Sequence, residues 1–187
     1  MENTKIFITG PYKIDKLNIA KKLISIDDDL SIAKRFTNND KYINSENDEY
    51  IYYMSTQDID LTYKNNFILF ANMDNYISTG ITLDSYYNDD IFVMSLEEFN
   101  NISDVIFKSE LYDIIVIWID GTFNKGNEFA QKDMIESRYM QERLSANKNI
   151  KYLYFFNETD EKIIDVILEY INTDEIEVRN ELLIENS

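Results

Sequence analysis

The 187-residue sequence contains no cysteine and no histidine, and each absence removes whole classes of chemistry. Without cysteine, the chain has no disulfide, no iron–sulfur ligand set and no thiolate nucleophile. Without histidine, the Ser-His-Asp and Cys-His arrangements cannot form, and neither can the usual zinc sites. Enzymes that depend on these groups are therefore excluded.

Basic residues are also scarce: 18 Lys and Arg stand against 35 Asp and Glu, which gives a net charge of −17. Neutralisation of phosphates by Lys and Arg supplies most of the affinity of proteins for nucleic acids and for anionic membranes. We therefore expect neither as a partner. A phosphate-bearing ligand would need a local positive pocket.

No apolar run approaches the ~20 residues of a membrane-spanning helix, and the apolar run near the N-terminus is too short for a signal peptide. We expect no export and a cytoplasmic location, which would be the host cytoplasm or the virion for a viral protein. The four glycines and one proline are few, whereas Asn, Ile, Lys, Asp and Tyr are abundant. This bias is typical of an AT-rich genome.

The length and the 44% hydrophobic content predict a single domain with a sizeable core. Hydrophobic periodicity predicts strands over 5–9, 50–54, 67–71, 91–94, 113–119 and 152–156, and helices over 16–24, 57–65, 96–106, 127–145 and 160–171. Residues 27–49 appear irregular apart from 30–36. The run after Asp113 lacks polar alternation, which is typical of a strand covered on both faces. The alternation of strands and helices predicts an α/β layered fold with a mainly parallel sheet.

The segment GPYKIDKL, residues 10–17, follows a strand and opens a helix, where a phosphate-binding loop G-x-x-x-x-G-K-[ST] would lie. Gly10 and Lys16 match this pattern, whereas Asp15 and Leu17 replace its second glycine and its hydroxyl. A simpler interpretation makes Lys16 an exposed lysine of the first helical turn and Asp15 a helix N-cap.

The order of the segments resembles guanylate kinase, the P-loop kinase that phosphorylates GMP. IFITGPYKIDKLNIAKKL resembles its phosphate loop, DEYIYYMSTQDIDLTYKNNFILFANMDNYISTG its nucleobase-binding segment, and IESRYMQERL its arginine-bearing helix. The resemblance covers most of residues 4–172 and implies a P-loop NTPase-like three-layer fold. It implies a core of about 1–30 and 88–172, an NMP-binding-like insertion of about 31–87, and an acidic tail over 173–187.

The resemblance also implies site residues. The vestigial nucleotide loop would comprise Gly10, Lys13, Asp15, Lys16 and Leu17. The acceptor or peptide cleft would comprise Arg35, Tyr50, Tyr52, Tyr76 and Gly80. In an active enzyme the catalytic cations would be Lys16, Arg138 and Arg143. The simpler interpretation assigns Tyr50 and Tyr52 to sheet packing, and Arg138 and Arg143 to ion pairs on an exposed helix face.

Several positions depart from the family pattern in ways that weaken catalysis. A carboxylate at Asp15 would repel phosphates, and Leu17 cannot replace the hydroxyl that holds Mg²⁺. The family's acceptor arginines and guanine-binding glutamate stand where this sequence has Asn39, Tyr42 and Leu69. Its strand-end carboxylate is replaced by Met94 or Ser95.

Because these changes occur together, the preferred hypothesis is a catalytically degenerate guanylate-kinase-like domain that acts as a protein-interaction or scaffold module. We then expect a protein partner or homo-oligomer, no cofactor and no resident metal. One alternative is a divergent nucleoside monophosphate kinase that uses ATP with Mg²⁺ held mainly by water and substrate oxygens. A second alternative is a structural subunit of a larger assembly.

Overall fold

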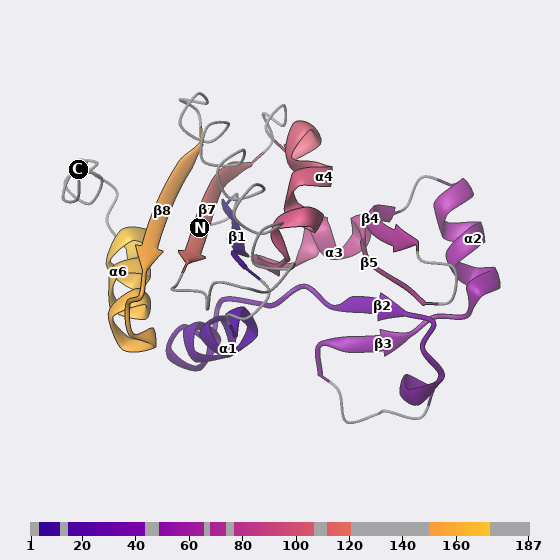
Figure 1. Ribbon diagram of the computed structural model, residues 1–187, viewed down its shortest axis with the longest axis horizontal. Coiled ribbons are helices and arrows are strands. Elements are labelled where there is room, and N and C mark those ends of the chain that lie inside the picture. Colours follow the sequence, from indigo (N-terminus) through magenta and orange to yellow (C-terminus); the bar gives the residue numbers. More distant parts are fainter. Residues whose placement is uncertain are drawn as a thin grey trace, which may run out of the picture.

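The described part of the chain forms two four-stranded sheets (Figure 1). The computed structural model describes residues 4–11, 15–43, 49–65, 68–73, 77–106, 112–120 and 150–172. The first sheet has the order β6-β1-β7-β8, and all three neighbouring pairs are parallel. Its strands are β1 (Thr4–Thr9), β6 (Ile91–Val93), β7 (Asp113–Asp120) and β8 (Lys151–Phe156). The mainly parallel sheet predicted from the sequence is therefore confirmed.

Helices cover both faces of the first sheet. On one face, α1 (Lys16–Ile26) and α6 (Asp160–Asn172) bury Ile6 and Ile8 of β1. On the other face, α4 (Leu96–Ile106) and α3 (Leu83–Asn88) pack over Phe7. Six successive residues of β7, from Ile114 to Ile119, are buried, because a strand covered on both faces needs an apolar side chain at every position.

The second sheet has the order β3-β2-β5-β4 and is mixed: β2 pairs parallel with β3, whereas β5 pairs antiparallel with β2 and β4. It consists of β2 (Arg35–Thr37), β3 (Ile51–Tyr53), β4 (Ile68–Met73) and β5 (Ser78–Thr82), with α2 (Thr56–Lys64) and a 3₁₀ turn, η1 (Asp40–Tyr42). In the chain this sheet lies between α1 and β6, within the predicted insertion. The exact limits of that insertion stay a prediction.

The sequence interpretation missed β5 and α3 and found β2 only within a longer segment. Strand β5 has the sequence STGIT, in which Gly80 interrupts a short run of residues that favour strands. It becomes a strand because β2 and β4 pair with its two edges. The predicted helix 127–145 and the acidic tail lie outside the described residues.

Of the helices in the described ranges, none combines the length and the apolar character that crossing a bilayer requires.

The stability of the fold should fall in alkaline solution in part because of Tyr170 on α6. Burial against the core raises the pKa of Tyr170 to about 12 from its ordinary value of 10.0. Above pH 10 the unfolded chain loses this phenolic proton, whereas the folded chain keeps it up to a pH of about 12. The free energy of unfolding is therefore unaffected by this group below pH 10 and decreases as the pH rises from 10 towards 12. Tyr170→Phe should therefore flatten the decline of the urea midpoint between pH 10 and 12. Tyr63→Phe, at an exposed tyrosine, is the matched control and should leave the decline as it is; an unaltered profile in Tyr170→Phe would contradict the assignment.

Candidate functional site

The connections of β1 and β6 create a topological switch point at the carboxyl ends of these neighbouring strands. The chain leaves β1 for α1 on one face of the sheet and leaves β6 for α4 on the opposite face. In open parallel sheets, ligands bind at such a switch point, outside the carboxyl ends of the strands. The loop that begins at Gly10 and the residues Met94 and Ser95 follow these two strand ends. The candidate site therefore lies between the first sheet and the incoming β2.

Gly10 is required by the close packing of the loop against β7. Its φ of +148° lies outside the range that L side chains readily adopt, and a Cβ built on it would be 2.0 Å from the carbonyl oxygen of Ile119. The obstacle is main chain in the middle of a paired sheet, so it cannot move aside cheaply. Glycine at position 10 thus has a packing reason that does not depend on any ligand.

Lys16 is buried and directed back at its own loop. Its side chain is only 8% exposed, and Nζ donates hydrogen bonds to the carbonyl oxygens of Gly10 (3.1 Å) and Pro11 (2.8 Å). The interpretation of Lys16 as an exposed first-turn lysine is therefore wrong. In this arrangement the ammonium compensates the dipoles of the loop carbonyls.

Asp15 caps α1, as its simpler interpretation predicted. One of its carboxylate oxygens accepts a hydrogen bond from the backbone N–H of Asn18 at 3.1 Å. Leu17 follows as a half-buried residue with no oxygen to offer a cation. Lys13 lies outside the described residues.

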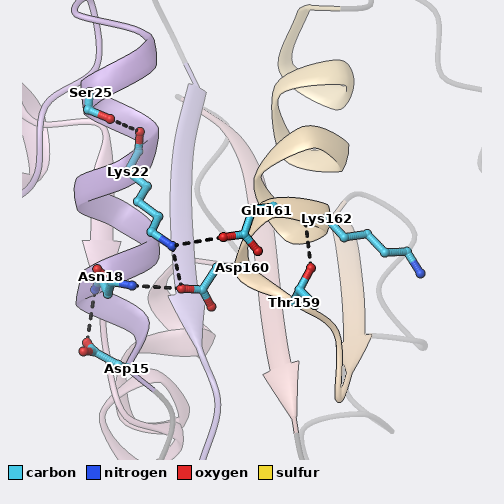
Figure 2. A network of polar contacts seen from close by, with 8 residues as sticks. All are labelled: Asp15, Asn18, Lys22, Ser25, Thr159, Asp160, Glu161 and Lys162. Carbon is cyan, nitrogen blue, oxygen red and sulfur yellow. Dashed lines mark hydrogen bonds and ion pairs between the residues drawn. The ribbon is translucent and has the colours of Figure 1, made fainter.

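A polar network fastens the first turns of α1 to the start of α6 (Figure 2). Asp160 accepts from Asn18 Nδ2 at 2.8 Å and from Lys22 Nζ at 2.9 Å, and Glu161 lies 3.8 Å from the same ammonium. The hydrogen bond with Asp160 is the main cause of the raised pKa of Lys22. The polar face of α1 next to the loop is thus engaged with α6.

Arg35, a cation of the predicted acceptor cleft, pairs with Glu98 on α4. Its Nη1 donates to Oε2 of Glu98 at 3.1 Å, its Nη2 donates to Oε1, and Nη1 also lies 3.4 Å from the carbonyl oxygen of Val93. Glu98 is 8% exposed and also accepts a hydrogen bond from the backbone N–H of Ser95 at 2.8 Å. This ion pair joins the second sheet to the core beside the end of β6.

A cleft of about 180 Å³ opens on the second sheet beside this ion pair. We call it the second-sheet cleft. Lys41 of η1 contributes an exposed ammonium, which lies 4.6 Å above the ring of Tyr42. The lining residues are Arg35, Phe36, Thr37, Asn39, Lys41, Tyr42, Ile51, Ile77 and Thr79. Asn39 and Tyr42, which the sequence resemblance aligns with the family's acceptor arginines, both line this cleft.

The other predicted cleft residues are placed elsewhere or are not described. Tyr50 lies beneath the ammonium of Lys21 on α1, with Nζ 4.7 Å from its ring centre. The pKa of Tyr52 is raised mainly by burial, and its hydroxyl bonds to the side chain of Thr82. Gly80 pairs with Phe36 and Ala71 inside the sheet.

Among the described lining residues of the second-sheet cleft, only Arg35 comes from the predicted set. Tyr76, Arg138 and Arg143 lie outside the described residues, so the roles assigned to them stay predictions.

Sequence reasoning missed Glu98 and Lys41. A signal for Glu98 was present, because Ser95 and Glu98 have the Ser-x-x-Glu spacing of a capping box. The hydroxyl of Ser95 indeed accepts from the backbone N–H of Glu98 at 3.2 Å. Nothing in the local sequence indicates that the same carboxylate also binds Arg35, 63 residues away.

The described residues of the loop do not fit a magnesium nucleotide. Leu17 has no oxygen in place of the metal-binding hydroxyl, and the Lys16 ammonium is already hydrogen-bonded to two loop carbonyls. In the part of the chain that the structure describes, no cluster of three or more acidic side chains is placed to hold a metal ion.

The fold is similar to that of guanylate kinase from Anaplasma phagocytophilum. The TM-score is 0.56, the match covers 94% of this chain and 88% of that one, and the sequence identity is 11%. The chain has a guanylate-kinase-like fold. No protein-family model and no curated protein sequence matches the chain. The sequence resemblance is thus confirmed for the architecture, and at this identity the match carries no statement about activity.

Proposed function

We propose that this guanylate-kinase-like domain does not transfer phosphate and serves as a protein-interaction module. One observation carries the proposal: both described cations of the predicted site, Lys16 and Arg35, are bonded to groups of the chain itself. Phosphoryl transfer depends on cations that meet the transferred group, so an enzyme needs these charges directed at the substrate.

The rest of the described site supports the same conclusion. Leu17 removes the side-chain ligand for Mg²⁺, and β6 ends at Val93, followed by Met94, where a carboxylate would be needed. The positions of the family's acceptor arginines hold Asn39 and Tyr42, whose side chains carry no charge to set against a phosphate. Each change alone weakens catalysis, and together they remove described side chains with which the family holds the metal ion and the acceptor phosphate.

A surface for protein partners is available on the second sheet and its helix. Large apolar side chains that remain exposed in solution mark interaction sites when they occur together in one part of a protein. Four exposed large apolar residues belong to the segments of the second sheet: Ile43, Leu61, Tyr63 and Ile77. Three more, Ile26, Tyr87 and Phe156, belong to the core, and we place the proposed partner surface on the second sheet because more of these side chains belong to its segments.

A sensitive radiometric assay with ATP, Mg²⁺ and GMP, dGMP or TMP tests the proposal. We expect no turnover above that of Lys16→Ala, and no thermal shift with ATP and Mg²⁺. A ligand at ~100 times its Kd would stabilise the fold by roughly 2.7 kcal/mol, which such a scan detects easily. Robust turnover that disappears in Lys16→Ala would overturn the proposal in favour of a divergent nucleoside monophosphate kinase.

A further inference from the structure

We infer that Glu98 is a built-in counter-anion that closes the second-sheet cleft to anionic ligands by occupying the guanidinium of Arg35. The inference concerns the affinity of this cleft for anions, and it holds whether or not the domain transfers phosphate.

The cleft has the composition of an oxyanion site. Arg35 and the exposed Lys41 are both lining residues of this cleft, and each carries a positive charge. Thr37, Asn39 and Thr79, whose side chains carry hydroxyl and amide groups, also line it. Guanidinium and ammonium groups beside short polar side chains are the chemistry that recognises phosphate or carboxylate oxygens.

Glu98 already provides such oxygens to Arg35. Both carboxylate oxygens accept from the two Nη groups, which is the bidentate geometry in which arginine binds a phosphate or a carboxylate ligand. An external anion that approaches Arg35 from the cleft therefore meets a guanidinium whose Nη groups are engaged and whose charge is neutralised.

The carboxylate is also fixed before any ligand arrives. Glu98 lies in the first turn of α4, and the backbone N–H of Ser95 donates to its Oε2 at 2.8 Å. With 8% exposure, it has little freedom to turn away into solvent. A ligand in solution must compete with an intramolecular partner that has lost its conformational entropy already. The cleft should consequently bind small anions weakly in the native protein.

Glu98→Gln is the sharpest test, because glutamine keeps the shape of the side chain and can still complete the capping box. The probe is inorganic phosphate, titrated at constant ionic strength and followed by NMR of the Arg35 guanidinium and of backbone amides in β2 and η1. Removing the counter-anion leaves one unit of positive charge uncompensated a few ångströms from the ligand, so phosphate should bind about tenfold more tightly.

Two further variants identify the source of the gain. Glu97→Gln changes the net charge equally on the neighbouring, exposed residue and should leave phosphate affinity at the native value. Arg35→Met combined with Glu98→Gln should abolish the gain. A gain that survives without Arg35, or that appears equally in Glu97→Gln, would overturn the inference.

The native protein supplies an independent measurement if Glu98→Gln fails to fold. The Arg35 guanidinium resonances should stay unperturbed by phosphate concentrations that shift the resonance of the Lys41 ammonium. Perturbation and saturation of the Arg35 resonances in the native protein would show that Glu98 does not close the cleft, as would an affinity in folded Glu98→Gln no higher than native.

Discussion

Gly10→Ala is expected to destabilise the fold by at least about 3 kcal/mol, because strained packing and an unfavourable backbone conformation add together. The new Cβ would lie 2.0 Å from the carbonyl oxygen of Ile119, far inside van der Waals contact. Relief would require moving the end of β7, which is held by β1 on one side and β8 on the other. A loss of this size is a large part of the stability of a typical domain.

Urea unfolding followed by far-UV circular dichroism measures this effect. Asp15→Asn, near the other end of the loop, is a suitable control because its amide oxygen can still cap the N–H of Asn18. That variant should retain nearly native stability. Surface substitutions usually change the free energy of unfolding by less than about 1 kcal/mol. A change that small in Gly10→Ala would contradict the observed packing.

Trp118→Ala should cost about 3–5 kcal/mol, the range observed when a large buried aromatic side chain is truncated. Trp118 is 1% exposed and lies in the middle of the core layer beneath α4. Its ring packs edge-on against Tyr154 at 6.0 Å between centres. The surrounding strands are paired on both sides, so the cavity left by truncation cannot collapse completely.

Trp118→Phe separates packing from hydrogen bonding at the same site. Within the described part of the chain, Nε1 of Trp118 is buried without a hydrogen-bond partner. Removing an unpaired donor breaks no hydrogen bond, so the Trp118→Phe variant should be markedly less destabilised than the Trp118→Ala variant. Equal losses in the two variants, from the same urea titration, would show that Nε1 does have a partner that matters.

The ion pair between Arg35 and Glu98 has structural as well as functional consequences. It joins β2 of the second sheet to α4 of the core, beside the end of β6. A ligand that separated the pair would also loosen this contact.

The core was predictable because its strands are continuous apolar runs. The run from Asp113 onwards is buried on both faces, and few structures other than a central parallel strand accommodate such a segment. The predicted helix over 96–106 has the same limits in the structure. The second sheet was only partly predictable, since β2 and β3 have three residues each and depend on pairing with their neighbours.

The residue pattern alone determined the layered α/β architecture, the absence of cysteine and histidine chemistry, and the altered phosphate loop, since these follow from composition and local periodicity. Only the tertiary structure decided which groups the charged side chains of Lys16 and Arg35 bind. Lys16 could have faced solvent and Arg35 a ligand, but folding placed Lys16 against two loop carbonyls and Arg35 against Glu98. Buried charges must find partners, and those partners lie wherever chain topology brings them, at separations that no local pattern encodes.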